Sequence, residues 1–266
     1  MKTMKGGEMG ETQGPPGTEI LRGLVGSGVH GTSIEGQDDR DEMGVTLETP
    51  DMVVGLRHFE QYIYRTQPEG VRSGAGDLDL TVYSARKYLR LALQGNPTVL
   101  LLLYVPDDLL VVNTPLGKEL RELAPAIASR QAAPRFLGYL RSQKERLLGL
   151  RGSGHGKRGG GRREEYIEQY GFDTKFAMHM VRLGYQGVEF LNTGRITLPM
   201  PEPSLTYCRA LRQGEIELND ALSTTGELEV ELKDLHTSSP LPEKPDYDGV
   251  NEWLASAYAR AWGWQQ

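Results

Sequence analysis

The sequence predicts an α+β protein whose strands lie mainly in the first 110 residues and whose helices dominate the remainder. Two observations support this division. Short apolar runs beside turn residues, at 19–25 and 80–83, have the length of β-strands. Later in the chain, apolar side chains recur at helical spacing, as Leu116, Leu120 and Leu123 do. At 266 residues the chain is long enough for one large domain or two small ones.

The elements of the first half are short and separated by turns. The expected order is strands at 19–25, 44–47 and 80–83, a helix at 84–94 and a second buried element at 98–104. The first strand runs into a turn at Gly26 and Ser27. Ser84 can cap the helix at its N-terminus, and Pro97 follows its expected end.

The second half is expected to be mainly helical. Helices are predicted, in order, at 114–129, 134–150, 164–170, 173–183, 205–212, 216–235 and 250–262. The acidic segment 216–235 is predicted to be a helix pair broken near residues 223–226. The aromatic side chains of the final helix, Trp253 and Trp262 among them, favour a face that docks on the body of the protein over a ligand platform.

These elements suggest four parts: a flexible arm at 1–18, a strand-rich core at 19–110, a helical region at 111–237, and a Pro-rich linker with a helix at 238–266. The helical region contains a Gly/Arg-rich loop at 149–163 with no apolar periodicity. Such a loop fits contact with a polynucleotide backbone or a triphosphate, and it equally fits a solvated spacer. The sequence leaves both interpretations open.

Composition limits the partners and the compartment. The formal net charge is −6, so overall charge does not attract nucleic acid and an RNA partner would need a local basic patch. The single cysteine, Cys208, excludes an intrachain disulfide and is interpreted as a packing residue. No segment approaches the roughly 18 apolar residues of a membrane span, and the first residues lack the apolar region of a secretory signal. We therefore expect a cytoplasmic protein with no membrane partner; the sequence does not indicate its oligomeric state.

Chemistry is indicated by a turn and three carboxylates. Gly26 lets the backbone turn so that N–H groups can face phosphate, and Ser27 adds a hydroxyl donor. Asp39 and Asp41 are two residues apart, so on an extended segment their side chains point the same way. Asp79 precedes a strand and can supply a third carboxylate. Together they predict a site that holds divalent metal against the phosphates of a nucleotide.

The order of these motifs resembles the signature of the DNA polymerase beta superfamily, and more closely its branch of predicted nucleotidyltransferases of the RNA repair pathway. The signature corresponds to Gly26-Ser27-Gly28-Val29-His30-Gly31-Thr32 followed by Asp39-Arg40-Asp41-Glu42-Met43-Gly44-Val45. Further similar blocks are 79–88, 91–97, 170–183, 189–194 and 212–215. The resemblance covers about residues 20 to 220 in scattered blocks.

The resemblance implies a nucleotidyltransferase core with a small mixed sheet flanked by helices, and carboxylates on adjacent strands. It implies transfer of NMP from an NTP with two Mg²⁺ ions, for which Mn²⁺ can substitute, and an RNA end as the usual acceptor. One feature departs from the signature, which prefers apolar residues where this chain has Arg40 and Glu42. We expect that this strand lies at an edge of the sheet, or that these two side chains pair with each other or with neighbours.

Cationic residues are further candidates for nucleotide binding. On the predicted helix 173–183, Lys175, His179 and Arg182 fall on one face, and Lys175 and Arg182 are predicted to bind phosphate. His30 is expected to contact phosphate or to brace the turn. Lys87 fits two roles equally, contact with the triphosphate or pairing with acids.

The sequence favours an enzyme that transfers a nucleotide to a hydroxyl on an RNA end, in RNA repair or tRNA modification. Transfer to a protein in a toxin or defence setting would use the same carboxylates. A non-catalytic nucleotide- or RNA-binding protein is the alternative from another class. A metal-dependent hydrolase is disfavoured because only five histidines are spread along the chain.

Overall fold

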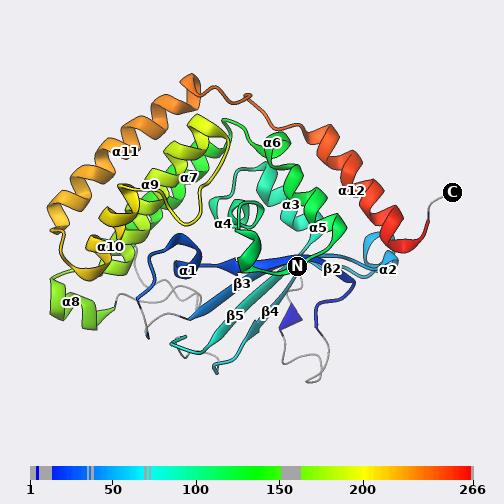
Figure 1. Ribbon diagram of the computed structural model, residues 1–266, viewed down its shortest axis with the longest axis horizontal. Helices are drawn as coiled ribbons and strands as arrows, with labels where there is room; N and C mark the ends of the chain where they lie inside the picture. The colour runs from blue at the N-terminus through cyan, green and yellow to red at the C-terminus, as the bar shows by residue number, and fades with distance from the viewer. Residues whose placement is uncertain are drawn as a thin grey trace. The chain divides into compact units, whose positions relative to one another are not determined.

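The computed structural model describes residues 4–5, 14–34, 36, 39–68, 71, 73–150 and 163–264. It contains two compact units (Figure 1). The sheet unit comprises Met1–Gln94, Thr98–Ile127 and Pro245–Gln266, and the helical unit comprises Gly95–Pro97 and Ala128–Lys244. Most of the predicted arm at 1–18 and residues 151–162 of the predicted Gly/Arg-rich loop lie outside the described residues.

A six-stranded mixed sheet forms the centre of the sheet unit, which confirms the predicted α+β class. Its strands are β1 (Met4–Lys5), β2 (Thr18–Val25), β3 (Arg40–Leu47), β4 (Gln61–Arg65), β5 (Leu78–Ser84) and β6 (Leu110–Asn113). Their order is β1-β4-β5-β3-β2-β6. β3 and β5 run parallel, whereas β2 pairs antiparallel with β3, and β4 pairs antiparallel with β5. β3 is therefore a central strand.

Helices, most of them short, complete the sheet unit. They are α1 (Ser27–His30), α2 (Pro50–Val53), α3 (Ala85–Leu93), α4 (Pro97–Leu100), α5 (Pro115–Glu122), α6 (Ala124–Ile127) and α12 (Tyr247–Trp262), with 3₁₀ turns at Leu101–Leu103 and Asp107–Leu109. Ser84 caps α3 as predicted, because its hydroxyl accepts a hydrogen bond from the Lys87 backbone N–H at 3.2 Å. α3 packs on β3 and β5, on the side of the sheet where α5 and α6 also lie in Figure 1.

One face of the central strand β3 carries charge, and those charges are paired. Glu42 is 5% exposed, and its carboxylate accepts a hydrogen bond from Arg40 at 2.6 Å and one from Arg22 of β2 at 3.4 Å. Arg22 also pairs with Glu19 at 3.2 Å. The expectation of an edge strand is wrong, whereas the expectation that Arg40 and Glu42 pair with each other is confirmed.

The C-terminal helix α12 docks within the sheet unit through its aromatic residues, as predicted. The Trp262 indole N–H donates to the Glu48 backbone carbonyl at 2.9 Å, and the Tyr258 hydroxyl donates to the buried Glu48 carboxylate. The Trp253 indole N–H donates to Glu119 of α5 at 3.0 Å. These side chains therefore bind the helix to α5 and to the segment after β3.

The helical unit is built around α9. Its helices are α7 (Ala132–Leu147), α8 (Glu164–Tyr170), α9 (Thr174–Thr193), α10 (Ser204–Gln213) and α11 (Leu218–Ser238). α9 packs against α7, α10 and α11 (Figure 1). Two glycines of α9 allow this close approach, since a Cβ at Gly184 would lie 2.7 Å from Leu228 and one at Gly187 would lie 2.8 Å from Leu232. Within the described residues, none of the helices is long and apolar enough to span a membrane.

The predicted break near residues 223–226 is wrong, because α11 is one continuous helix. Leu228, Leu232 and Leu235 form a buried stripe at helical spacing. The Thr225 hydroxyl donates to the Ala221 carbonyl at 2.7 Å and thus stays within the helix. A single Gly226 costs about 1 kcal/mol relative to Ala, which the packing of this stripe offsets.

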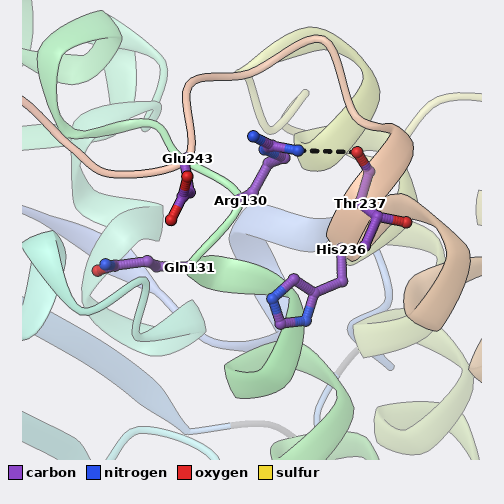
Figure 2. A pocket seen from close by; sticks show the side chains of 5 residues that line it. All are labelled: Arg130, Gln131, His236, Thr237 and Glu243. Carbon is purple, nitrogen blue, oxygen red and sulfur yellow. Dashed lines mark hydrogen bonds between the residues drawn. The ribbon is translucent and has the colours of Figure 1, made fainter.

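A polar pocket lies where α7 begins and α11 ends in the helical unit. It is lined by Arg130, Gln131, His236, Thr237 and Glu243 (Figure 2). The Arg130 guanidinium donates to the Thr237 backbone carbonyl at 2.7 Å, so this cation ties the end of α11 to the start of α7. None of the residues predicted to bind nucleotide or metal lines it.

Candidate active site

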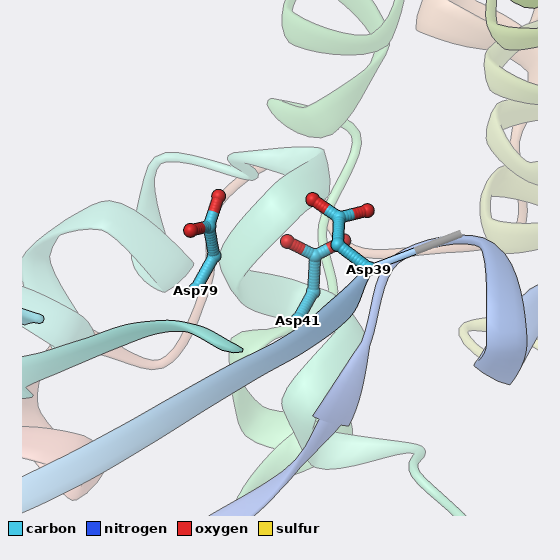
Figure 3. A group of neighbouring side chains, drawn as sticks. All are labelled: Asp39, Asp41 and Asp79. Atoms are coloured by element: carbon cyan, nitrogen blue, oxygen red, sulfur yellow. The ribbon is translucent and has the colours of Figure 1, made fainter. Parts of the chain in front are cut away.

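Strand register brings the three predicted carboxylates together. Asp41 of β3 is paired directly with Asp79 of β5, and Val25 at the end of β2 is paired with Asp41. Asp39 lies two residues before Asp41 and extends on the same side (Figure 3). One oxygen from each of the three carboxylates lies within 4.8 Å of the others. Because the parallel strands β3 and β5 both begin here, the acids lie at one end of the sheet.

The donor set fits a hard divalent cation. Mg²⁺ and Mn²⁺ prefer carboxylate oxygens, and three such oxygens converge here from partly buried side chains. The same face of β3 continues from Asp41 into Met43, Val45 and Leu47, all of which are buried. The acidic group is therefore anchored directly to the core of the sheet unit.

Gly26 allows the end of β2 to pass close to Asp41. Its backbone has φ +82° and ψ −156°, a conformation that is essentially restricted to glycine. A Cβ at this position would lie 2.2 Å from the Asp41 Oδ2 atom. Two features therefore require glycine at this position of the predicted turn: the unusual backbone conformation and the close approach of the Asp41 carboxylate.

Ser27 and His30 follow Gly26 on the short helix α1, and both are buried. The Ser27 carbonyl accepts a hydrogen bond from the Thr32 backbone N–H at 3.0 Å, and Gly31 ends the helix with φ +77°. The turn is therefore closed by its own backbone. This geometry agrees with the turn predicted at Gly26 and Ser27 after the first strand.

Asp79 is held by three side chains that sequence reasoning missed. Arg65 is its direct partner across the β4–β5 pair and donates to Oδ2 at 2.6 Å. The Gln67 amide donates to Oδ1 at 2.8 Å, and the Ser73 hydroxyl donates to Oδ2 at 2.9 Å. Only the register of β4 identifies Arg65, since no local motif connects it to an acid 14 residues later. We call Arg65, Gln67 and Ser73 the Asp79 support.

Lys87 is not brought to the carboxylates. It follows Ser84 at the far end of β5, and the strand from Asp79 to Ser84 spans roughly 16 Å at about 3.3 Å per residue. Its ammonium group donates to Glu60 at 3.1 Å and to Gln61 at 2.8 Å. Of the two predicted roles, pairing with acids is thus the one observed, and contact of Lys87 with the triphosphate stays a prediction.

Lys175 and Arg182 belong to the helical unit, where the helix predicted at 173–183 forms but continues to Thr193 as α9, and it places them on one face with His179. Asp173 caps the helix by accepting hydrogen bonds from the backbone N–H groups of Lys175 and Phe176 at 3.1 Å. The Arg182 guanidinium donates to the Gln186 side chain at 2.8 Å. Burial lowers the pKa of Arg182 to about 10, which leaves the side chain charged at neutral pH.

A central sheet with three carboxylates where two adjacent parallel strands begin, bordered by a glycine turn, is the arrangement expected of a nucleotidyltransferase of the DNA polymerase beta type. Comparison with protein families agrees with this class. The chain matches the RNA repair pathway DNA polymerase beta family, RlaP, over residues 17–256, and it belongs to that family. The resemblance inferred from the motifs is therefore confirmed. No curated protein is significantly similar to the chain.

Proposed function

We propose that this protein is a metal-dependent nucleotidyltransferase that moves NMP from an NTP to a hydroxyl at an RNA end and releases pyrophosphate. The observation that carries the proposal is the convergence of Asp39, Asp41 and Asp79 within 4.8 Å at one end of the sheet. Membership of the RNA repair family supports RNA as the acceptor.

Each acid has a role in this proposal. Two divalent cations held by such carboxylates stabilise the attacking and leaving oxygens of an in-line displacement. Asp39 and Asp41 are assigned to both cations. Asp79 is assigned to one of them and takes the proton from the attacking hydroxyl. The hydroxyl oxygen forms a bond to the α-phosphorus, the bond from that phosphorus to the bridging oxygen breaks, and pyrophosphate leaves.

The nucleotide would be held by backbone as well as side chains. The turn at Gly26 and Ser27 offers N–H groups and a hydroxyl to the β- and γ-phosphates, and His30 braces the turn from within. In the helical unit, Lys175 and Arg182 are separate candidates for binding a phosphate of the NTP or of the RNA, because ammonium and guanidinium groups pair with phosphate oxygens.

The test incubates the purified full-length protein with Mg²⁺, each α-labelled NTP in turn and total small RNA. The triad variant is Asp39→Ala/Asp41→Ala, checked for native helix content by circular dichroism. The matched control is Asp51→Ala, which removes an exposed carboxylate that pairs with Arg57 after the opposite end of β3. We expect label on RNA with the wild type and the control, and none with the triad variant.

Other results would change the proposal in defined ways. Label on the protein, or on an added protein, would replace RNA with a protein acceptor. Intact NTP binding with no transfer to any acceptor would identify a non-catalytic binding protein. Equal transfer by the wild type and the folded triad variant would refute the assignment of the carboxylates.

A further inference from the structure

In the helical unit, cationic side chains from three elements converge on one histidine. Arg163 precedes α8, Lys175 and Arg182 lie on the same face of α9, and Arg212 lies in the last turn of α10. All four act electrostatically on the imidazole of His179. Among the described residues these four cations disfavour protonation of the ring, while the Asp173 carboxylate in contact with them is paired with Arg163.

The arrangement is built by packing and does not result from mobile surface side chains. Arg163 pairs with the buried Asp173 at 3.3 Å, and its guanidinium lies 5.2 Å from the centre of the Phe176 ring. Arg212 is only 3% exposed, and its guanidinium lies 5.4 Å from the centre of the Tyr166 ring. Both cations are therefore fixed against aromatic rings, which lowers the cost of holding them in place.

A second contact fixes α8 against the end of α10. Gly214, which ends α10 with φ +78°, packs so closely on Tyr170 of α8 that a Cβ would lie 2.2 Å from the ring. The Arg163–Asp173 pair joins the start of α8 to the start of α9. The helices that carry the cations are therefore connected at both ends of α8.

His179 supplies a polar atom that lacks a partner among the described residues. Its Nδ1 atom is buried and makes no hydrogen bond there. Burial, together with the four cations, lowers the pKa of the imidazole well below its usual value, so the ring is neutral at pH 7. A neutral ring can carry a proton on Nδ1 and donate it to an anionic oxygen.

We propose that Arg163, Lys175, Arg182 and Arg212 form, around His179, a site that binds a phosphate group of a nucleotide or of an RNA strand. Guanidinium groups match the oxygens of a phosphate in pairs, and several cations together favour an anion with more than one negative charge. The Asp173 carboxylate is already bound by Arg163 and by the backbone N–H groups of Lys175 and Phe176, so the groups left to face a ligand are cationic and the ligand is an anion and not a metal. The proposal does not depend on the chemistry of the carboxylates in the sheet unit.

The experiment uses the full-length protein in EDTA, which prevents metal-dependent binding at the carboxylates. The His179 imidazole resonance, assigned by comparison with His179→Gln, is followed by NMR during titration with four probes: inorganic phosphate, an NTP, a 5′-phosphorylated RNA oligonucleotide and its 5′-hydroxyl counterpart. We expect a phosphate-bearing probe to shift this resonance and to raise the pKa of His179, because the bound anion offsets the surrounding cations.

Variants separate a binding role from a structural one. Arg212→Met and the more exposed Arg163→Met should each weaken binding about tenfold, which corresponds to about 1.4 kcal/mol. Arg209→Met on the exposed side of α10 is the matched control and should bind as the wild type does. If Arg212→Met fails to fold, Arg163→Met carries the test.

The probes also identify the source of the phosphate. Tighter binding of the NTP would assign the site to the nucleotide, and tighter binding of the 5′-phosphorylated RNA would assign it to the acceptor strand. Absence of a shift with all four probes, or a shift that persists unchanged in both Arg variants, would overturn the proposal. A lack of transferase activity in the RNA labelling test would not affect the outcome of this NMR titration, because the titration measures binding in EDTA and does not require turnover.

Discussion

Replacing Arg65 with methionine tests whether the Asp79 support positions this carboxylate. Methionine keeps much of the aliphatic volume and removes the cation that donates to Asp79 Oδ2 at 2.6 Å. Gln67 and Ser73 would remain on the carboxylate, at 2.8 and 2.9 Å, so Asp79 would be loosened and not released. We therefore expect a partial loss of function and an intact fold.

The expected size of this loss follows from the solvent exposure of the Arg65 side chain. A hydrogen bond to a charged group contributes about 1.5–3 kcal/mol when it is protected. The Arg65 side chain is 52% exposed, so solvent screening reduces its contribution to about 1 kcal/mol. At about 1.4 kcal/mol per tenfold change, this predicts that kcat of Arg65→Met falls about fivefold. KM for the NTP should change little, since the side-chain contact of Arg65 among the described residues is with the acid.

The same substitution should change metal binding in the opposite direction. Arg65 and a divalent cation both seek the oxygens of Asp79, so removing the guanidinium removes a competing positive charge. Binding of Mn²⁺, measured by electron paramagnetic resonance without substrate, should therefore tighten in Arg65→Met. Arg57→Met, which breaks an exposed pair with Asp51 at 3.3 Å, serves as the control and should change neither quantity. Wild-type turnover together with wild-type Mn²⁺ affinity in Arg65→Met would refute the positioning role.

Three further substitutions test the site and the fold. Gly26→Ala should reduce transfer at least tenfold in the labelling assay and lower the free energy of unfolding by about 1–3 kcal/mol. The reason is that its Cβ would lie 2.2 Å from Asp41 Oδ2, in a backbone conformation that alanine disfavours. Full activity of this variant would show that the turn can shift. Glu42→Gln should lower the free energy of unfolding in urea by about 1–3 kcal/mol, since it removes the counter-charge of Arg22 and Arg40. An unchanged free energy of unfolding would show that the pairing of these arginines with Glu42 does not stabilise the protein. Hydrogen bonds from Arg260 lower the pKa of Glu119 from its usual 4.5, so this stabilisation is present above pH 4.5 and is lost as pH falls through the lower folded value. The Tm of the wild type should therefore fall more steeply with acidification than that of Glu119→Gln, and parallel melting curves would contradict this.

The sequence was sufficient to predict the features that depend on local pattern. The spacing of Asp39 and Asp41 determines that they point the same way on extended chain. The placement of Asp79 beside them was a prediction of the family resemblance, and the register of β3 with β5 agrees with it. Helix α9 was predicted from its Asp173 cap and its periodic apolar residues.

Features that depend on pairing between distant segments could not be predicted. Arg65 meets Asp79 only because β4 pairs with β5 in one register, and a shift of one residue would turn its side chain to the other face. Lys87 could be placed near the acids or away from them until the direction of β5 was known. The continuity of α11 depends on Leu228 packing over Gly184 of α9, a contact that the composition of residues 223–226 does not indicate.

The alternation of side chains along a strand explains how charged residues can lie beside the three candidate carboxylates. On β3, Asp41 lies on one face, and Arg40 and Glu42 lie on the other. Because Arg40 and Arg22 both pair with Glu42, the second face carries no uncompensated carboxylate that would repel a neighbour and distort the strand. The direct pairing of Asp41 with Asp79, on which the convergence of the three acids depends, is therefore preserved although the apolar pattern of the signature is broken. Replacement of apolar residues by Arg40 and Glu42 thus changes how the strand is stabilised and leaves the geometry of the carboxylates intact.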